Sequence, residues 1–388
     1  MAGRSLTMRR RSFLFGAAAA LPLAGCGWPP LLSTPTGLSL TPIKTFSQIE
    51  SAGLLKLAGL KGVSAEHAVD CYRVGYGSHD AAGRPIRLSG LLALPRGVTA
   101  RGLVSWQHGT TTTRKEVPSN LSVDGAAAAI VFGGGGYAVL AADYIGLGAS
   151  QLTHTYLVAD DTSRAVVDLI HAARGVAGVP QAPPFLIGFS QGGHACLAAQ
   201  QGLEAQGQPV LGVAAIAGPH NLRTITLGAA LQGRSSQDSL YLAYMTRGYA
   251  ARYGQRMESV LTPQAAALTR SMFDTPHDPP AIMAALPPKP RPMFRTDFLD
   301  AFDRGGDHWL LAALAANETS HFKPRAPLRL YYGAQDLDVI PTEALETTRM
   351  LNAQGGDAQA FSVGPYDHNN SIVHAAPLAL AWLKELRG

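Results

Sequence analysis

A serine flanked by glycines is the clearest chemical feature of this 388-residue chain. Ser190 lies at the centre of the sequence GFSQG (188–192), after the apolar run 185–187 and before the small-residue stretch 193–199. This order predicts a strand, a sharp turn and a helix, and such a turn presents the serine hydroxyl above the end of a sheet. The pentapeptide alone is also compatible with an ordinary Gly-Ser turn, but its flanks favour a nucleophilic serine.

A nucleophilic serine needs a general base, and the chain has twelve histidines. His368 lies on the loop between a predicted last strand (358–363) and a predicted closing helix (about 372–386), so we expect it to be the base. His374 falls inside that helix, and His194, one helical turn after the serine, is interpreted as a buried packing residue. The other histidines lack the spacing typical of metal sites, and we expect neither a metal nor a cofactor.

An acid is expected on the loop after a strand of the same sheet, where it can fix the tautomer of the base and stabilise the imidazolium. The β-prone run 328–332 ends at Gly333, and two aspartates follow, Asp336 and Asp338. The distance from Gly333 favours Asp336. Asp338 remains the alternative, and one of the two would then cap the turn or the following helix.

Acyl transfer also needs N–H donors aimed at the oxyanion, and the loss of one donor typically costs about 3 kcal/mol of transition-state stabilisation. One candidate is the backbone N–H of Gln191, directly after the serine. The second is the backbone N–H of Thr110, because the apolar run 102–106 leads into the sequence QHGTTTT (107–113). The alternative for this segment is a threonine-rich turn whose hydroxyls satisfy one another.

Taken together, these motifs resemble the α/β-hydrolase superfamily. The sequences that carry the resemblance are HGTT (108–111), DYIGLGAS (143–150), GFSQGG (188–193), GAQD (333–336) and DH (367–368). The segment 143–148, followed by HTY (154–156), is similar to the secretory lipase and related serine-esterase group. The resemblance implies a catalytic triad of Ser190, Asp336 and His368. Phe189 departs from the pattern, since many relatives carry histidine or tyrosine there.

The elements around the motifs alternate between strands and helices. The predicted helices are 163–173 and 193–205, and the predicted strands are 185–187 and 210–217. Such alternation indicates a mostly parallel, doubly wound sheet with helices on both faces, an α/β class of fold. Within one domain (46–388), the helix-rich stretch of about 220–324 is expected to be a cap over the pocket. Its large apolar residues are expected to form the core of the cap.

The first 26 residues have the parts of an export signal. Three arginines (9–11) precede an apolar segment (13–25), which is shorter than the ~20 residues of a membrane-spanning helix. The arginines resemble a twin-arginine signal, and LAGC, ending at Cys26, resembles the lipobox of bacterial lipoproteins. We therefore expect a signal peptide (1–25), lipidation at Cys26, a spacer (26–45) and an exported protein that is anchored to the membrane by lipid.

The net charge of the chain is +5, but the signal contains four arginines and no acidic residue, so the mature chain carries only +1. Nucleic acid is therefore not an expected partner. Besides Cys26, the chain contains Cys71 and Cys196, and the sequence leaves open whether they form a disulfide.

These features predict a serine hydrolase that cleaves small or lipid-like carboxylic esters through an acyl-enzyme intermediate, as a carboxylesterase or lipase does. Two alternatives remain. The same triad would serve a polyester depolymerase or an amidase-type hydrolase, and a surface lipoprotein could retain the fold for binding alone.

Overall fold

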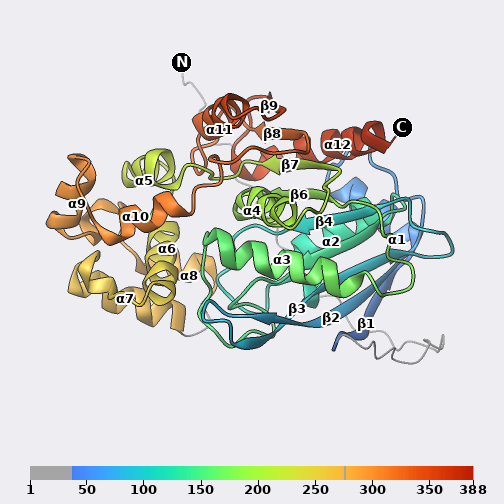
Figure 1. Cartoon of the computed structure of the whole chain (residues 1–388), viewed down its shortest axis with the longest axis horizontal. Coiled ribbons are helices and arrows are strands. Elements are labelled where there is room, and N and C mark those ends of the chain that lie inside the picture. Colours follow the sequence, from blue (N-terminus) through green and yellow to red (C-terminus); the bar gives the residue numbers. More distant parts are fainter. Residues whose placement is uncertain (1–36, 275–276, 388) are drawn as a thin grey trace, which may run out of the picture. The chain divides into compact units, whose positions relative to one another are not determined.

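The computed structural model describes residues 37–274 and 277–387, and this part of the chain contains a nine-stranded sheet (Figure 1). The strands are β1 (Ser39–Phe46), β2 (Val69–His79), β3 (Pro85–Pro95), β4 (Leu103–Gln107), β5 (Ala138–Ala142), β6 (Phe185–Phe189), β7 (Gly212–Ile216), β8 (Leu328–Tyr332) and β9 (Ala358–Ser362). Their order across the sheet is β1-β2-β3-β5-β4-β6-β7-β8-β9. The pairs β1–β2, β2–β3 and β3–β5 are antiparallel. The remaining pairs, from β5–β4 to β8–β9, are parallel.

Helices cover both faces of this sheet. They are α1 (Gln48–Leu57), α2 (Val123–Ala128), α3 (Ala159–Ala173), α4 (Gln191–Ala205), α11 (Thr342–Ala353) and α12 (His368–Arg387). Apolar side chains of α3, α4 and α11 share one buried cluster with the sheet, and those of α1, α2 and α12 share another. Figure 1 shows α3 and α4 in front of the sheet. The predicted α/β-hydrolase fold, with a mostly parallel and doubly wound sheet, is confirmed.

Six further helices lie between β7 and β8 in the described residues. They are α5 (Leu227–Leu231), α6 (Asp238–Arg252), α7 (Pro263–Asp274), α8 (Pro279–Ala285), α9 (Thr296–Asp303) and α10 (Trp309–Ala316). This cap has its own apolar core, in which Met293, Phe294 and Phe298 are buried. Phe273 and Trp309 pack against that core from partly exposed positions.

Several boundaries differ from those expected from the sequence. Residues 39–46 form β1, which pairs with β2, so ordered structure begins inside the expected spacer 26–45. His368 is the first residue of α12, which begins four positions earlier than predicted, rather than lying on a loop before it. The signal peptide and Cys26 lie outside the described residues. Within those residues, no helix has the length and apolar character needed to cross a membrane.

The carboxyl ends of the parallel strands meet at one edge of the sheet, where ligands bind in open α/β folds. The loop after β4 begins at His108, and Ser190 follows β6. Asp336 follows β8, and His368 follows β9. Strand connectivity therefore brings four segments that are distant in sequence to a single site.

Candidate active site

Ser190 occupies a strained turn between β6 and α4. Its backbone angles are φ 56° and ψ −119°, a conformation that non-glycine residues rarely adopt. A Cβ at Gly188 would overlap the carbonyl of Gly192, and a Cβ at Gly192 would overlap the carbonyl of Gln107. The glycines on either side are therefore required by close backbone contacts, and they let the turn display the Ser190 side chain.

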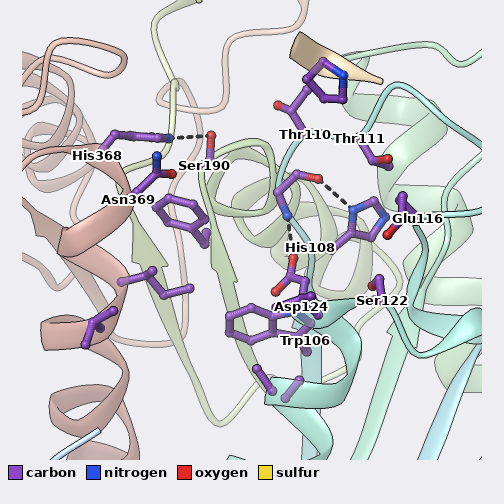
Figure 2. Close-up of a pocket in the computed structure, with 18 of the residues that line it drawn as sticks. Trp106, His108, Thr110, Thr111, Glu116, Ser122, Asp124, Ser190, His368 and Asn369 are labelled. Atoms are coloured by element: carbon purple, nitrogen blue, oxygen red, sulfur yellow. Dashed lines mark hydrogen bonds between the residues drawn. The ribbon is translucent and has the colours of Figure 1, made fainter. Parts of the chain in front are cut away.

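Ser190, His368 and Asp336 form a continuous hydrogen-bonded chain. Nε2 of His368 lies 2.9 Å from Oγ of Ser190 (Figure 2), and its Nδ1 lies 2.7 Å from Oδ2 of Asp336. A carboxylate only accepts hydrogen bonds, so Nδ1 carries the proton and Nε2 is free to accept the serine hydroxyl. The side chains of His368 and Asp336 are 5% and 0% exposed, which keeps water from competing for this hydrogen bond.

The two aspartates after β8 have different partners. The second oxygen of Asp336 accepts the backbone N–H groups of Asp338 and Val339, each at 2.9 Å. Asp338 instead accepts hydrogen bonds from the Ser235 hydroxyl and the Gln237 amide of the cap. Asp336 is thus the aspartate bonded to His368, and Asp338 connects the loop to the start of the cap.

The oxyanion candidates lie on two loops next to Ser190. Neither the N–H of Thr110 nor that of Gln191 donates to an acceptor in the described part of the protein. The carbonyls of His108 and Thr111, on either side of Thr110, accept hydrogen bonds from the hydroxyls of Tyr144 and Tyr244, at 3.2 and 3.1 Å. The loop is therefore held through its carbonyls, while the Thr110 N–H is left available to a ligand.

Asp124, in the first turn of α2, contacts the same loop. Its Oδ2 accepts the N–H of Gly109 at 3.0 Å, and the Gly109 carbonyl lies 2.8 Å from Nδ1 of His108 (Figure 2). Removal from water raises the pKa of Asp124 from 3.8 to about 6, although the hydrogen bond from Gly109 acts in the opposite direction. Burial lowers the pKa of His108 to about 4, so this imidazole is neutral at pH 7.

A cavity of about 600 Å³ opens beside Ser190 and His368. Much of its wall is apolar, and the apolar lining residues are Ala58, Leu60, Trp106, Val123, Ala127, Ala128, Val131, Phe132, Phe189, Leu240, Pro279, Ile372, Val373 and Ala376. Thr110, Asp124 and Glu116 supply polar groups to the same wall. Of the cap, α6 lines it with Leu240 and Tyr241, and the start of α8 with Pro279. The size and lining suit an organic substrate with a substantial apolar part.

His194 and the two cysteines do not line this cavity. His194 is fully buried, and its Nε2 lies 2.9 Å from the carbonyl oxygen of Asn317, in keeping with a packing role. Cys71 and Cys196 are buried and not bonded to each other. Burial raises the pKa of Cys71 to about 12 and that of Cys196 well above its usual value, so both stay protonated at neutral pH. Among the described residues, no cluster of three potential metal ligands occurs.

Comparison with protein-family models and with curated proteins gives no match. Solved structures share the fold. A hydrolase of provisional assignment from Legionella pneumophila has a TM-score of 0.84 at 24% identity, over 92% of this chain and 98% of that chain. The rice cell wall degrading esterase LipA from Xanthomonas oryzae has a TM-score of 0.76 at 20% identity, over 92% and 97%. Candida antarctica lipase A in its closed state has a TM-score of 0.67 at 13% identity, over 89% and 80%.

The sequence did not single out Asp124 or Tyr244, two of the residues that hold the loop of Thr110. Ser122 caps the start of α2, and Asp124 lies two residues later. In the sequence, Asp124 therefore resembles an ordinary acidic residue in the first turn of a helix. Tyr244 belongs to the cap, far along the chain from the threonines that it contacts. These roles depend on tertiary contacts and leave no local pattern.

Proposed function

We propose that this protein is a serine hydrolase that cleaves carboxylic esters, as a carboxylesterase or a lipase does. The observation that carries the proposal is the hydrogen-bonded chain from Ser190 through His368 to Asp336, which borders a largely apolar cavity. The nearby free N–H of Thr110 supports the same reaction, because acyl transfer needs a donor for the developing negative charge.

The mechanism follows from where the protons lie in the hydrogen-bonded series Ser190, His368 and Asp336. Nε2 of His368 takes the proton of Ser190 as the serine oxygen attacks the ester carbonyl. The N–H groups of Thr110 and Gln191 bind the resulting oxyanion, and Asp336 stabilises the imidazolium. His368 then gives its proton to the leaving alcohol, and water repeats the sequence on the acyl-enzyme.

An ester is the favoured substrate class. The cavity wall is mainly apolar, which suits an acyl or alcohol group that is lipid-like. Two of the proteins that share the fold are named as an esterase and a lipase, which supports the same class. An amidase-type hydrolase and a non-catalytic binding protein remain alternatives that the ester and anilide assay below separates from an esterase. A polyester depolymerase, which cleaves the same kind of bond, remains an alternative within the ester class.

We further propose that the protein is exported as a lipoprotein, since the first 26 residues resemble a lipoprotein signal ending at Cys26. Each buried methylene of a lipid anchor adds ~0.8 kcal/mol of membrane affinity. Expression of the full chain in bacteria, followed by fractionation, tests this point. The wild type should sediment with membranes and Cys26→Ser should not, whereas identical fractionation of the two would reject the anchor.

The activity is tested with nitrophenyl esters from acetyl to palmitoyl and with matched nitroanilides, using residues 37–388 and the Ser190→Ala variant. We expect serine-dependent hydrolysis of the esters and much slower hydrolysis of the anilides. A faster reaction with anilides would favour an amidase. No turnover of any substrate by a folded wild type would reject the proposal.

A further inference from the structure

A short buried segment between β5 and α3 contacts both residues that carry the proposed oxyanion donors. Nε2 of His154 lies 2.9 Å from the side-chain amide nitrogen of Gln191. The hydroxyl of Tyr156 lies 2.8 Å from Oγ1 of Thr110. His154 and Tyr156 are 3% and 4% exposed, and neither lines the cavity. Segment 154–156 therefore connects the loop after β4 with the loop after β6 without reaching the substrate space.

The roles of the two ring nitrogens of His154 are fixed by its surroundings. Nδ1 lies 2.7 Å from the carbonyl oxygen of Ile145, which only accepts hydrogen bonds, so Nδ1 carries a proton. Burial lowers the pKa of His154 to about 4, so the ring is neutral near pH 7. Nε2 therefore accepts the N–H of the Gln191 amide. The reverse amide orientation would require a charged imidazolium in a buried site.

Close backbone packing leaves this segment little freedom to move. A Cβ at Gly146 would overlap the backbone of His154. From the other side, a Cβ at Gly248 of α6 would lie 2.9 Å from the carbonyl oxygen of His154 and 2.9 Å from the nitrogen of Tyr156. The segment is thus held between the turn after β5 and a helix of the cap.

Tyr244, also on α6, joins the cap to the same arrangement. Its ring centre lies 5.0 Å from that of Tyr156 and 5.6 Å from that of His154. Its hydroxyl donates to the carbonyl of Thr111, the residue after Thr110. Helix α6 therefore contacts segment 154–156 and the oxyanion loop at the same time.

We propose that segment 154–156 is a positioning element for the oxyanion hole, through which the cap helix α6 fixes the loops of Thr110 and Gln191. The inference rests on the proposed function, because it assigns a role in the same reaction. His154 and Tyr156 act through Gln191 and Thr110 rather than on the substrate. Donors that are fixed before the reaction stabilise a transition state without reorganisation at the moment of attack.

The variant that tests this role with least disturbance is Tyr156→Phe, which removes one hydroxyl. Its matched control is Tyr76→Phe, because Tyr76 on β2 is fully buried and its hydroxyl donates to the carbonyl of Ala165 in α3 at 2.8 Å rather than to either donor loop. Removal of an oxyanion donor lowers kcat by roughly 10²- to 10³-fold. In Tyr156→Phe the donor is displaced rather than removed, so we expect kcat to fall by about tenfold. We expect KM to change little in Tyr156→Phe, and we expect Tyr76→Phe to keep the kcat of the wild type.

A second measurement separates donor positioning from a general loss of structure. A trifluoromethyl ketone carrying the acyl chain of the best ester forms an adduct on serine whose oxyanion resembles that of the transition state. Its inhibition constant should rise in Tyr156→Phe by about the same factor by which kcat/KM falls. Gly248→Ala, which displaces the segment, should follow the same correlation, and Tyr76→Phe should keep the kcat/KM and the inhibition constant of the wild type.

The outcomes distinguish this inference from the function on which it rests. If the wild type shows no Ser190-dependent turnover, both the proposed function and the inference are rejected. If turnover depends on Ser190 but the two phenylalanine variants have equal kcat and equal inhibition constants, only the positioning role is rejected.

Discussion

Nε2 of His368 lies 2.9 Å from Oγ of Ser190, although 178 positions separate the two residues in the chain. The contact joins the turn after β6 to the start of α12, so the order of strands in the sheet determines it. The ring of Phe189 lies 4.7 Å from that of His368 and covers one side of the imidazole. A base placed in this way, with its other nitrogen bonded to a buried aspartate, is set to accept the serine proton.

The two aspartates after β8 should differ in their importance for catalysis. Asp336→Asn keeps the shape of the side chain but no longer favours the tautomer of His368 that accepts from serine, and in a triad this lowers kcat by ~10⁴. Asp338→Asn should lower kcat by less than about tenfold, because Asp338 contacts the cap instead. Steady-state kinetics on one ester would measure both variants. Equal losses, or a larger loss in Asp338→Asn, would overturn the assignment.

The glycine after the turn should be essential for stability. In Gly192→Ala the new methyl group would overlap the Gln107 carbonyl, so we expect destabilisation on the order of 3 kcal/mol. Gly53→Ala is the control, because a Cβ there meets nothing within 4 Å and the helix α1 should gain ~0.5–1 kcal/mol. Urea denaturation would measure both changes. Equal stability of Gly192→Ala and the wild type would show that the backbone of the turn does not pack closely against the Gln107 carbonyl.

Asp124 should make stability depend on pH. Its pKa is about 6 in the folded protein against 3.8 normally, so the fold favours the protonated carboxyl. The contribution of Asp124 to the free energy of unfolding is therefore greatest at low pH, and it is lost as the pH rises from about 4 to about 6. Asp124→Asn stays neutral and still offers an oxygen to the N–H of Gly109.

The melting temperature of Asp124→Asn should exceed that of the wild type at pH 7.5, and the difference should shrink toward pH 4. Thermal denaturation of both proteins across this range tests the expectation. A variant that is less stable than the wild type at pH 7.5 would mean that the ionised carboxylate stabilises the fold.

The wall of the cavity should set the preferred length of the substrate. Ala127 lines the cavity from an exposed position on α2, so a larger side chain there should leave the core intact. Ala127→Trp should shift the rate maximum in a nitrophenyl ester series to shorter chains. An unchanged chain-length profile would show that the apolar part of the substrate lies elsewhere.

Local sequence order was enough to predict the turn at Ser190, because its glycines and its apolar strand are adjacent in the chain. His368 could be predicted from its position after a final strand, but the start of α12 could not be located from composition. Residues 39–45 of the expected spacer belong to β1, and their serine, threonine and proline give no local sign of a strand, because the pairing with β2 is a tertiary property. The contacts of Asp124, His154 and Tyr156 likewise appear only once distant loops come together.

Covalent labelling tests the central claim most directly. The protein would be treated with an alkyl fluorophosphonate, which phosphonylates an activated serine with loss of fluoride, and the modified peptide would be identified by mass spectrometry. We predict one phosphonyl group on Ser190, formed rapidly in the wild type and at least about 10³-fold more slowly in His368→Ala. Labelling at another residue, or equal rates in the two proteins, would contradict the assignment of Ser190 as a nucleophile activated by His368.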